Sequence, residues 1–220
     1  MDITERELKL VPESETLLEQ LAAIDRLGPF HVRGRRREMQ RNAFFDTRDR
    51  TLQRERVGFR RRVVEGTPVA SWTIKGDARV VGAVAMRSEI ELQLQADMPP
   101  GLALNALREA AWRRGASALA ESVSDALASG GLPLAVPVLE TRTDRRIVDL
   151  EEPARDWQVE LALDRMELVG HTYREVEIEA ELKRGDEQAL EVIRQAITAL
   201  GVVRASDGSK LSRALAALQR

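Results

Sequence analysis

Glu5, Glu7 and Lys9 are the first residues of the sequence whose types and spacing could do chemistry together. Residues 2–10 follow the two-residue period of a β-strand, with Leu8 and Leu10 on the opposite face, so the three charged side chains point the same way. Two carboxylates can hold a divalent cation, and a neighbouring ammonium group can bind a phosphate oxygen. The trio therefore indicates a site for a metal-bound chain of phosphates.

Charged side chains share one face on several later segments that have strand periodicity. These ladders are Arg60 and Arg62, Lys75, the set Arg87, Glu89 and Glu91, the pair Glu160 and Asp164, and the run Glu175, Glu177, Glu179 and Glu181. A single ladder is typical of the solvated face of a half-buried sheet. Four neighbouring carboxylates repel one another, however, and an exposed surface gives no reason to concentrate them.

The repulsion is relieved if strands of opposite charge face each other or if ions lie between them. A closed antiparallel barrel with a polar interior and an apolar outer surface covered by helices would allow both. Buried charge is costly unless it is paired or coordinates an ion, so a charged interior indicates function. Carboxylates suit Mg²⁺ or Mn²⁺, while arginine and lysine suit phosphate oxygens, and together they are what phosphoryl transfer needs.

The coarse order of elements indicates an α+β fold. Strand patterns cover residues 2–10, 41–46, 57–65, 69–76, 86–95, 138–150, 156–164 and 173–182, and helical patterns cover 15–27, 102–128, 186–200 and 209–219. The prediction is a closed eight-stranded antiparallel barrel with helices outside. It forms a single domain over residues 1–220, with a helical segment at about 102–130 between two β-rich halves. Arg35, Arg36 and Arg37 are expected in a solvated loop.

Composition excludes several function classes. The 220 residues are 43% hydrophobic and 32% charged, and there is no cysteine, which excludes thiolate nucleophiles and disulfides. Aromatic residues make up only 4% and the net charge is −2, so no nucleic-acid patch is predicted. No apolar run approaches the roughly 18 residues of a membrane span. We expect a cytoplasmic protein that binds neither nucleic acid nor a membrane, with a homodimer left open.

The sequence resembles the CYTH superfamily, also called the triphosphate tunnel metalloenzymes. The motifs that carry the resemblance follow the family's order along the whole chain. They are Glu5-x-Glu7-x-Lys9, Phe44-Phe45-Asp46-Thr47 followed by Leu52, Arg60-Arg61-Arg62, Thr73-Ile74-Lys75-Gly76, Arg87-x-Glu89-x-Glu91, Glu177-x-Glu179-x-Glu181-Leu182, and Ser209-Lys210 followed by Arg213. The resemblance implies a tunnel of eight antiparallel strands.

The resemblance also implies roles for individual residues. The metal, Mg²⁺ or Mn²⁺, would be held by Glu5 and Glu7 with Glu177, Glu179 and Asp164. The triphosphate would be bound by Lys9, Arg60, Arg62, Lys75, Arg87, Lys210 and one arginine of Thr141–Arg146, where Arg145 is preferred to Arg142. Glu89 and Glu91, together with Lys75, are the predicted catalytic residues.

The predicted reaction is metal-dependent hydrolysis of inorganic triphosphate to pyrophosphate and phosphate. Two other enzymes remain as alternatives, a thiamine triphosphatase and a class IV-type adenylate cyclase. A sensor module that binds polyphosphate without catalysis is the non-enzymatic alternative. In each case the partner is a small-molecule triphosphate or a related phosphate chain.

Overall fold

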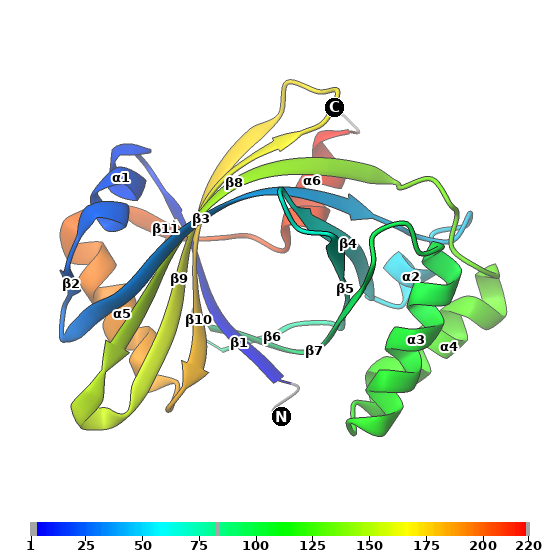
Figure 1. The fold of residues 1–220 in the computed structure, drawn as a ribbon, viewed down its shortest axis with the longest axis horizontal. Helices are drawn as coiled ribbons and strands as arrows, with labels where there is room; N and C mark the ends of the chain where they lie inside the picture. Colours follow the sequence, from blue (N-terminus) through cyan, green and yellow to red (C-terminus); the bar gives the residue numbers. More distant parts are fainter. Residues whose placement is uncertain (1–3, 82–83, 219–220) are drawn as a thin grey trace.

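Eight antiparallel strands close into a barrel in the computed structural model, which describes residues 4–81 and 84–218 (Figure 1). The strands of the barrel are β1 (Thr4–Pro12), β3 (Phe30–Phe44), β4 (Gly58–Val64), β5 (Val69–Lys75), β7 (Val84–Gln95), β8 (Leu139–Glu152), β9 (Trp157–Leu168) and β10 (Arg174–Arg184). They follow one another around the barrel as β1, β10, β9, β8, β3, β4, β5 and β7, and β7 pairs with β1 to close it. The predicted closed antiparallel barrel is confirmed.

Three short strands and six helices complete the described part of the chain. The short strands are β2 (Arg26–Leu27), β6 (Arg79–Val81) and β11 (Val203–Ala205). The helices are α1 (Thr16–Ala23), α2 (Thr51–Arg54), α3 (Pro100–Arg113), α4 (Ser117–Gly130), α5 (Gln188–Leu200) and α6 (Lys210–Ala217), with a 3₁₀ turn at Pro153–Arg155. Residues 2, 3 and 219, which the sequence placed in a strand and a helix, lie outside the described residues. The longest described helices have 14 residues, and none is apolar and long enough to cross a membrane.

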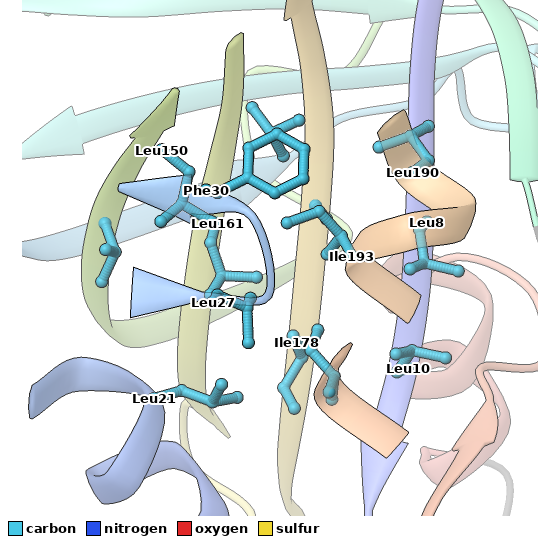
Figure 2. Close-up of a cluster of buried hydrophobic side chains, with 14 of the residues drawn as sticks. Leu8, Leu10, Leu21, Leu27, Phe30, Leu150, Leu161, Ile178, Leu190 and Ile193 are labelled. Carbon is cyan, nitrogen blue, oxygen red and sulfur yellow. The ribbon is translucent and has the colours of Figure 1, made fainter. Parts of the chain in front are cut away.

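Helices cover the apolar outer surface of the barrel on two sides (Figure 1). On one side, α1 and α5 pack against the outer faces of β1, β8, β9 and β10, and this core includes Leu8, Leu21, Phe30, Ile178 and Ile193 (Figure 2). On the other side, α2, α3 and α4 cover β4, β5 and β7. Alternation along each strand thus sends apolar side chains outward under the helices and leaves the other face for the interior.

The second core contains an aromatic cluster. The rings of Phe45, Phe59 and Trp72 lie 5.5–5.7 Å apart between centroids, and Phe59 and Trp72 are fully buried. Phe59 directly precedes Arg60 on β4. Because successive side chains of a strand point to opposite faces, a Phe59 ring packed under the outer helices places Arg60 on the inner face of the barrel.

The arginine run Arg35–Arg37 is not a loop, as the sequence predicted, but the middle of the 15-residue strand β3. Arg37 pairs with Asp144 on β8 at 2.8 Å, and Arg36 pairs with Asp149 at 2.7 Å. Arg35 bonds to Asp25, beyond the end of α1, at 3.1 Å. Each of the three arginines has an aspartate outside β3 as its partner, which is why three successive arginines can belong to a strand.

Gly185 gives a test of the packing between β10 and β9. Its φ is +107°, and a Cβ atom there would lie 2.3 Å from Cδ1 of Trp157, which is 3% exposed. We expect Gly185→Ala to lower the free energy of unfolding by about 3 kcal/mol or more, because the side chain adds a clash to the strain of a positive φ. Urea denaturation measures the loss.

Gly170→Ala is the matched control. Gly170 also has a positive φ, +78°, but no atom within 4 Å of its Cβ position, so only the backbone cost of about 1 kcal/mol is expected. Equal losses of unfolding free energy in Gly185→Ala and Gly170→Ala would show that contact with Trp157 does not restrict the side chain at position 185.

Candidate functional site

The barrel encloses a cavity of about 1210 Å³. Almost every residue that the sequence singled out as a site residue lines it. These residues are Glu5, Glu7 and Lys9 on β1, Arg60 and Arg62 on β4, Lys75 on β5, Arg87, Glu89 and Glu91 on β7, Arg145 on β8, Asp164 on β9, Glu179 on β10 and Lys210 on α6. Glu177 is the exception, because it is completely buried behind Lys210 and is not part of the cavity wall.

Strand register brings these residues together from distant parts of the chain. Glu5 lies opposite Arg87 in the β1–β7 pair, and Lys75 lies opposite Glu89 in the β5–β7 pair. Asp164 lies opposite both Arg145 and Glu177. Residues directly opposite in an antiparallel pair share a face of the sheet. The register therefore sets Glu5, Glu89 and Asp164 each beside a base, while the facing acids Asp164 and Glu177 both contact Lys210.

One network of ion pairs joins β1, β5 and β7. Arg87 donates to Glu5 at 2.7 Å and to Glu7 at 2.6 Å. Lys75 contacts Glu5 at 2.9 Å and Glu89 at 2.6 Å. The carboxylates of Glu5 and Glu7 therefore converge on one cationic group, and Glu5 joins that group to a second cation.

A second network joins β8, β9, β10 and α6. Arg145 pairs with Asp164 at 2.6 Å and with Glu179 at 2.5 Å. Lys210 contacts Asp164, Glu177 and Glu179 at 2.7–2.8 Å. Lys9 links the two networks, since it contacts Glu7 at 3.1 Å and Glu179 at 3.2 Å.

Helix α6 is fixed to the barrel by its charged residues and by a small apolar cluster. Arg213 donates to Glu175 and Glu177 at 2.8 Å, and Ser206 donates to Glu177 at 2.6 Å. Ser209 caps the first turn of the helix with its side chain. Ala214 packs with Leu139 and Leu168, beside Leu211 and Leu215. The cap fixes the start of the helix, which directs Lys210 at the acids of the barrel.

Arg60 and Arg62 differ from the other cations of the cavity. Neither has a carboxylate oxygen within 4.0 Å in the described part of the chain. Arg60 donates weakly to Thr73 at 3.4 Å, and its Nε is buried without a partner. Arg62 donates from Nε to Oδ1 of Asn42 at 3.1 Å. Burial, together with the charges of Arg60 and Arg145, lowers the pKa of Arg62 to about 9.

Three acids of the cavity, Glu5, Glu179 and Glu89, have pKa values that are shifted in different directions. Burial raises the pKa of Glu5, but Lys75 and Arg87 outweigh it, and the net pKa lies far below the ordinary value. Glu179 is lowered in the same way by Lys210 and Lys9. The pKa of Glu89 is instead raised, by burial and by the charge of Glu5, against the opposing charge of Lys75. Glu89 is thus the more basic carboxylate beside a strongly acidic one.

The donor set fits a hard divalent cation, because every candidate ligand is a carboxylate oxygen. No group of three or more acidic or histidine side chains stands ready to hold a metal ion among residues 4–81 and 84–218. The reason is visible in the ion pairs: Arg87, Lys75, Lys9 and Lys210 lie between the acids. Since the carboxylates already converge on cationic groups, exchange of a side-chain cation for a metal ion keeps their charge compensated.

Arg142 and Arg145 lie on opposite faces of β8. Arg145 lines the cavity, whereas Arg142 is exposed on the outside, 4.0 Å from Glu167. The sequence also missed several polar residues of the cavity wall, namely Gln40, Asn42, Thr141 and Thr143. Neutral polar side chains occur on every kind of surface, so the sequence alone does not mark these four as cavity residues. Their place in the cavity wall is known only from the pairing of their strands with strands that carry charged site residues.

The sequence from residue 4 to residue 215 matches the family model of the CYTH domain. The chain belongs to the CYTH family, and this family includes triphosphatases. No match was found among curated proteins.

Solved structures share the fold over nearly the whole chain. A protein from Hippeastrum, described as a candidate adenylyl cyclase with a dominant triphosphatase activity, is 21% identical with a TM-score of 0.67, covering 97% of this chain and 96% of that one. A candidate adenylate cyclase from Bacillus halodurans is 20% identical with a TM-score of 0.56, covering 96% and 98%. The PH1819 protein of Pyrococcus horikoshii is 16% identical with a TM-score of 0.54, covering 97% and 99%. At these identities the likeness establishes the fold.

Asp164 tests whether the buried ion pairs hold the barrel together. It is fully buried, and Asp164→Asn leaves Arg145 and Lys210 with one compensating charge fewer. We expect the free energy of unfolding at pH 7 to fall by about 3 kcal/mol. Glu167→Gln, on the same strand but exposed, should cost under about 1 kcal/mol. Similar losses of unfolding free energy in the two variants would show that burial does not strengthen the ion pairs of Asp164.

The same pair predicts a pH dependence. Burial raises the pKa of Asp164, but Arg145 and Lys210 outweigh it and lower the net pKa. Because the folded pKa is below the unfolded value of about 4, the stabilisation is present at neutral pH and is lost as pH falls through the folded pKa. Denaturation between pH 7 and pH 2 should therefore show a smaller loss of stability in Asp164→Asn than in the wild type.

Proposed function

We propose that this protein hydrolyses inorganic triphosphate to pyrophosphate and phosphate in a reaction that depends on Mg²⁺ or Mn²⁺. The observation that carries the proposal is the contrast within the cavity between the five ion-paired cations and the two arginines without an ion pair, Arg60 and Arg62. A buried guanidinium without a carboxylate in direct contact favours an anion, and phosphate oxygens match its planar array of donors.

The cations of the cavity have separate parts in this proposal. Arg60 and Arg62 bind non-bridging phosphate oxygens directly, since no carboxylate competes for them. Lys9, Lys75, Arg87, Arg145 and Lys210 also bind the chain, but each must first exchange a carboxylate for a phosphate oxygen. Every assigned contact is to a phosphate, and none requires a group attached to the chain, which is why inorganic triphosphate is the proposed substrate.

The acids of β1 and of β9 and β10 are the proposed metal ligands. Glu5 and Glu7 share Arg87, and Glu179 and Asp164 share Arg145, so each pair already directs its oxygens toward one point. Glu177 would join them from beneath Lys210. A bound divalent cation neutralises the charge that moves toward the leaving pyrophosphate. The exchange of partners frees Arg87 and Lys9 for the phosphates.

Glu89 is the proposed base for the attacking water, with Glu91 beside it on β7. Its raised pKa makes it the better proton acceptor at neutral pH. In the reaction, the water oxygen bonds to the terminal phosphorus, the anhydride P–O bond breaks toward pyrophosphate, and the water proton passes to Glu89. Lys75, at 2.6 Å, would stabilise the ionised form of Glu89 and orient it.

Phosphate release measured in parallel on triphosphate, ATP and thiamine triphosphate, with Mg²⁺ or Mn²⁺, tests the function. We expect triphosphate to be cleaved fastest. Release from thiamine triphosphate alone, or formation of cyclic AMP from ATP, would assign the site to one of the alternative enzymes. Triphosphate bound but left intact with every metal would favour a polyphosphate-binding module.

Glu5→Gln tests the metal-binding role. It removes a charged metal ligand while keeping the shape of the side chain, so we expect phosphate release to fall at least a thousandfold, about 4 kcal/mol in the barrier. The fold should survive because Arg87 and Lys75 keep Glu7 and Glu89 as partners. Glu140→Gln, on the outer face of β8, should change neither rate nor stability. An unfolded Glu5→Gln protein would instead make this acid structural.

Lys9→Ala tests the phosphate-binding role. The acids that it contacts, Glu7 and Glu179, keep Arg87, Arg145 and Lys210 as partners. We expect KM for triphosphate to rise about tenfold or more, since a charge-assisted contact is lost, with a smaller change in kcat. Arg41→Ala, at an exposed position of β3, removes one positive charge outside the cavity and is the control. Unchanged KM and kcat in Lys9→Ala would contradict the assignment.

A further inference from the structure

Arg62 is held inside the barrel by a neutral side chain. Its Nε donates to Oδ1 of Asn42 at 3.1 Å. Asn42 lies directly opposite Arg62 in the β3–β4 pair, lines the cavity and is 5% exposed. Every other assigned cation of the cavity apart from Arg60 bonds to at least two carboxylates.

The hydrogen bond fixes the orientation of the amide. An arginine Nε only donates, so the oxygen of Asn42 must face Arg62. The two N–H donors of the amide bond to no protein atom in the described ranges. An amide in this orientation presents only donors to the cavity, which favours an anion there. An aspartate of the same size would present a second oxygen and would neutralise the arginine.

We propose that Asn42 is a positioning residue for the phosphate chain, because it fixes the guanidinium of Arg62 at the cavity wall without neutralising its charge. The proposal rests on the proposed function, and it assigns a part to a residue outside the motifs of the sequence. Arg60 and Arg145 repel Arg62, so a residue at position 42 that makes no hydrogen bond would allow the guanidinium to move away from its place. A carboxylate would hold it but would compete with the substrate.

Calorimetric titration with sodium triphosphate, in buffer freed of divalent metal, tests the proposal. We expect Asn42→Asp to weaken binding about tenfold to a hundredfold, the value of a charge-assisted contact. Asn42→Ala, which removes the bond but adds no charge, should weaken it only a few fold. Asn105→Asp is the matched control, because Asn105 is the other asparagine of the chain and lies on α3 outside the barrel. It should bind as the wild type does.

The dependence on Arg62 decides between positioning and a general effect on structure. In an Arg62→Gln background, Asn42→Ala should not weaken binding further, and Asn42→Asp should weaken it less than in the wild type, by the direct repulsion of its carboxylate alone. Equal effects of Asn42→Asp and Asn42→Ala, or full effects in the Arg62→Gln background, would overturn the proposal. If Asn42→Asp does not fold, a double-mutant cycle of Asn42→Ala and Arg62→Gln tests the proposal instead. Additive effects on triphosphate binding in that cycle would overturn the proposal.

The experiment also separates this proposal from the proposed function. If the Asn42 variants bind triphosphate with the expected differences in affinity but the wild type does not cleave it with any metal, hydrolysis is overturned and the positioning role of Asn42 is supported. If the wild type cleaves triphosphate but Asn42→Asp binds it as tightly as the wild type does, only the positioning role of Asn42 is overturned. A wild-type protein that does not bind triphosphate would overturn both.

Discussion

Charge buried inside this barrel must be compensated, by an opposite charge of the protein or by a bound ion, and that requirement shapes the rest of the structure. Buried ions lose their hydration, and only close opposite charges or a bound ion compensate for the loss. The β1–β7 pairing that closes the barrel is also the pairing that sets Glu5 beside Arg87. Closure of the sheet and neutralisation of its interior are therefore achieved by the same strand pair.

The outside of the barrel follows from the inside. Because charged residues occupy the inward positions of the strands, the apolar residues between them point outward, where they need a cover. Helices α1 and α5 on one side and α2, α3 and α4 on the other provide it (Figure 1). Helix α6 has a different relation to the barrel, since its first residue, Lys210, contributes a charge to the cavity.

The interior is not uniform in charge balance. Most acids and bases on β1, β5, β7, β8, β9 and β10 form ion pairs with one another, whereas Arg60 and Arg62 on β4 bond to hydroxyl and amide groups. An anion gains more from the unpaired arginines than from bases already engaged with carboxylates. The β3–β4 wall is accordingly where a phosphate chain would first be held. In the proposed reaction, the acids on β1 and β10 would take up a metal only as their own cations turn to the substrate.

Much of the architecture could be predicted from the two-residue alternation of charge, because a strand with acids on one face and leucine or isoleucine on the other has few alternatives. The length of β3 could not, since Arg35, Arg36 and Arg37 break the alternation. Their partners are Asp25, on the preceding segment, and Asp149 and Asp144, more than a hundred residues away. The two- and three-residue strands β2, β6 and β11 exist only because neighbouring strands offer them hydrogen bonds. The burial of Glu177 behind Lys210 and the contact of Asn42 with Arg62 likewise arise from tertiary register, which no local pattern encodes.

In the proposed function, the acids and bases of the cavity exchange partners when a metal-bound triphosphate enters. A crystal structure with triphosphate and Mn²⁺, with the metal located by its anomalous scattering, tests this most directly. We expect Mn²⁺ on the oxygens of Glu5 and Glu7, with Arg87 moved to a phosphate oxygen and with Arg60 and Arg62 bound to the same phosphate chain. Triphosphate bound in the cavity while the Arg87 ion pairs with Glu5 and Glu7 stay intact would contradict it.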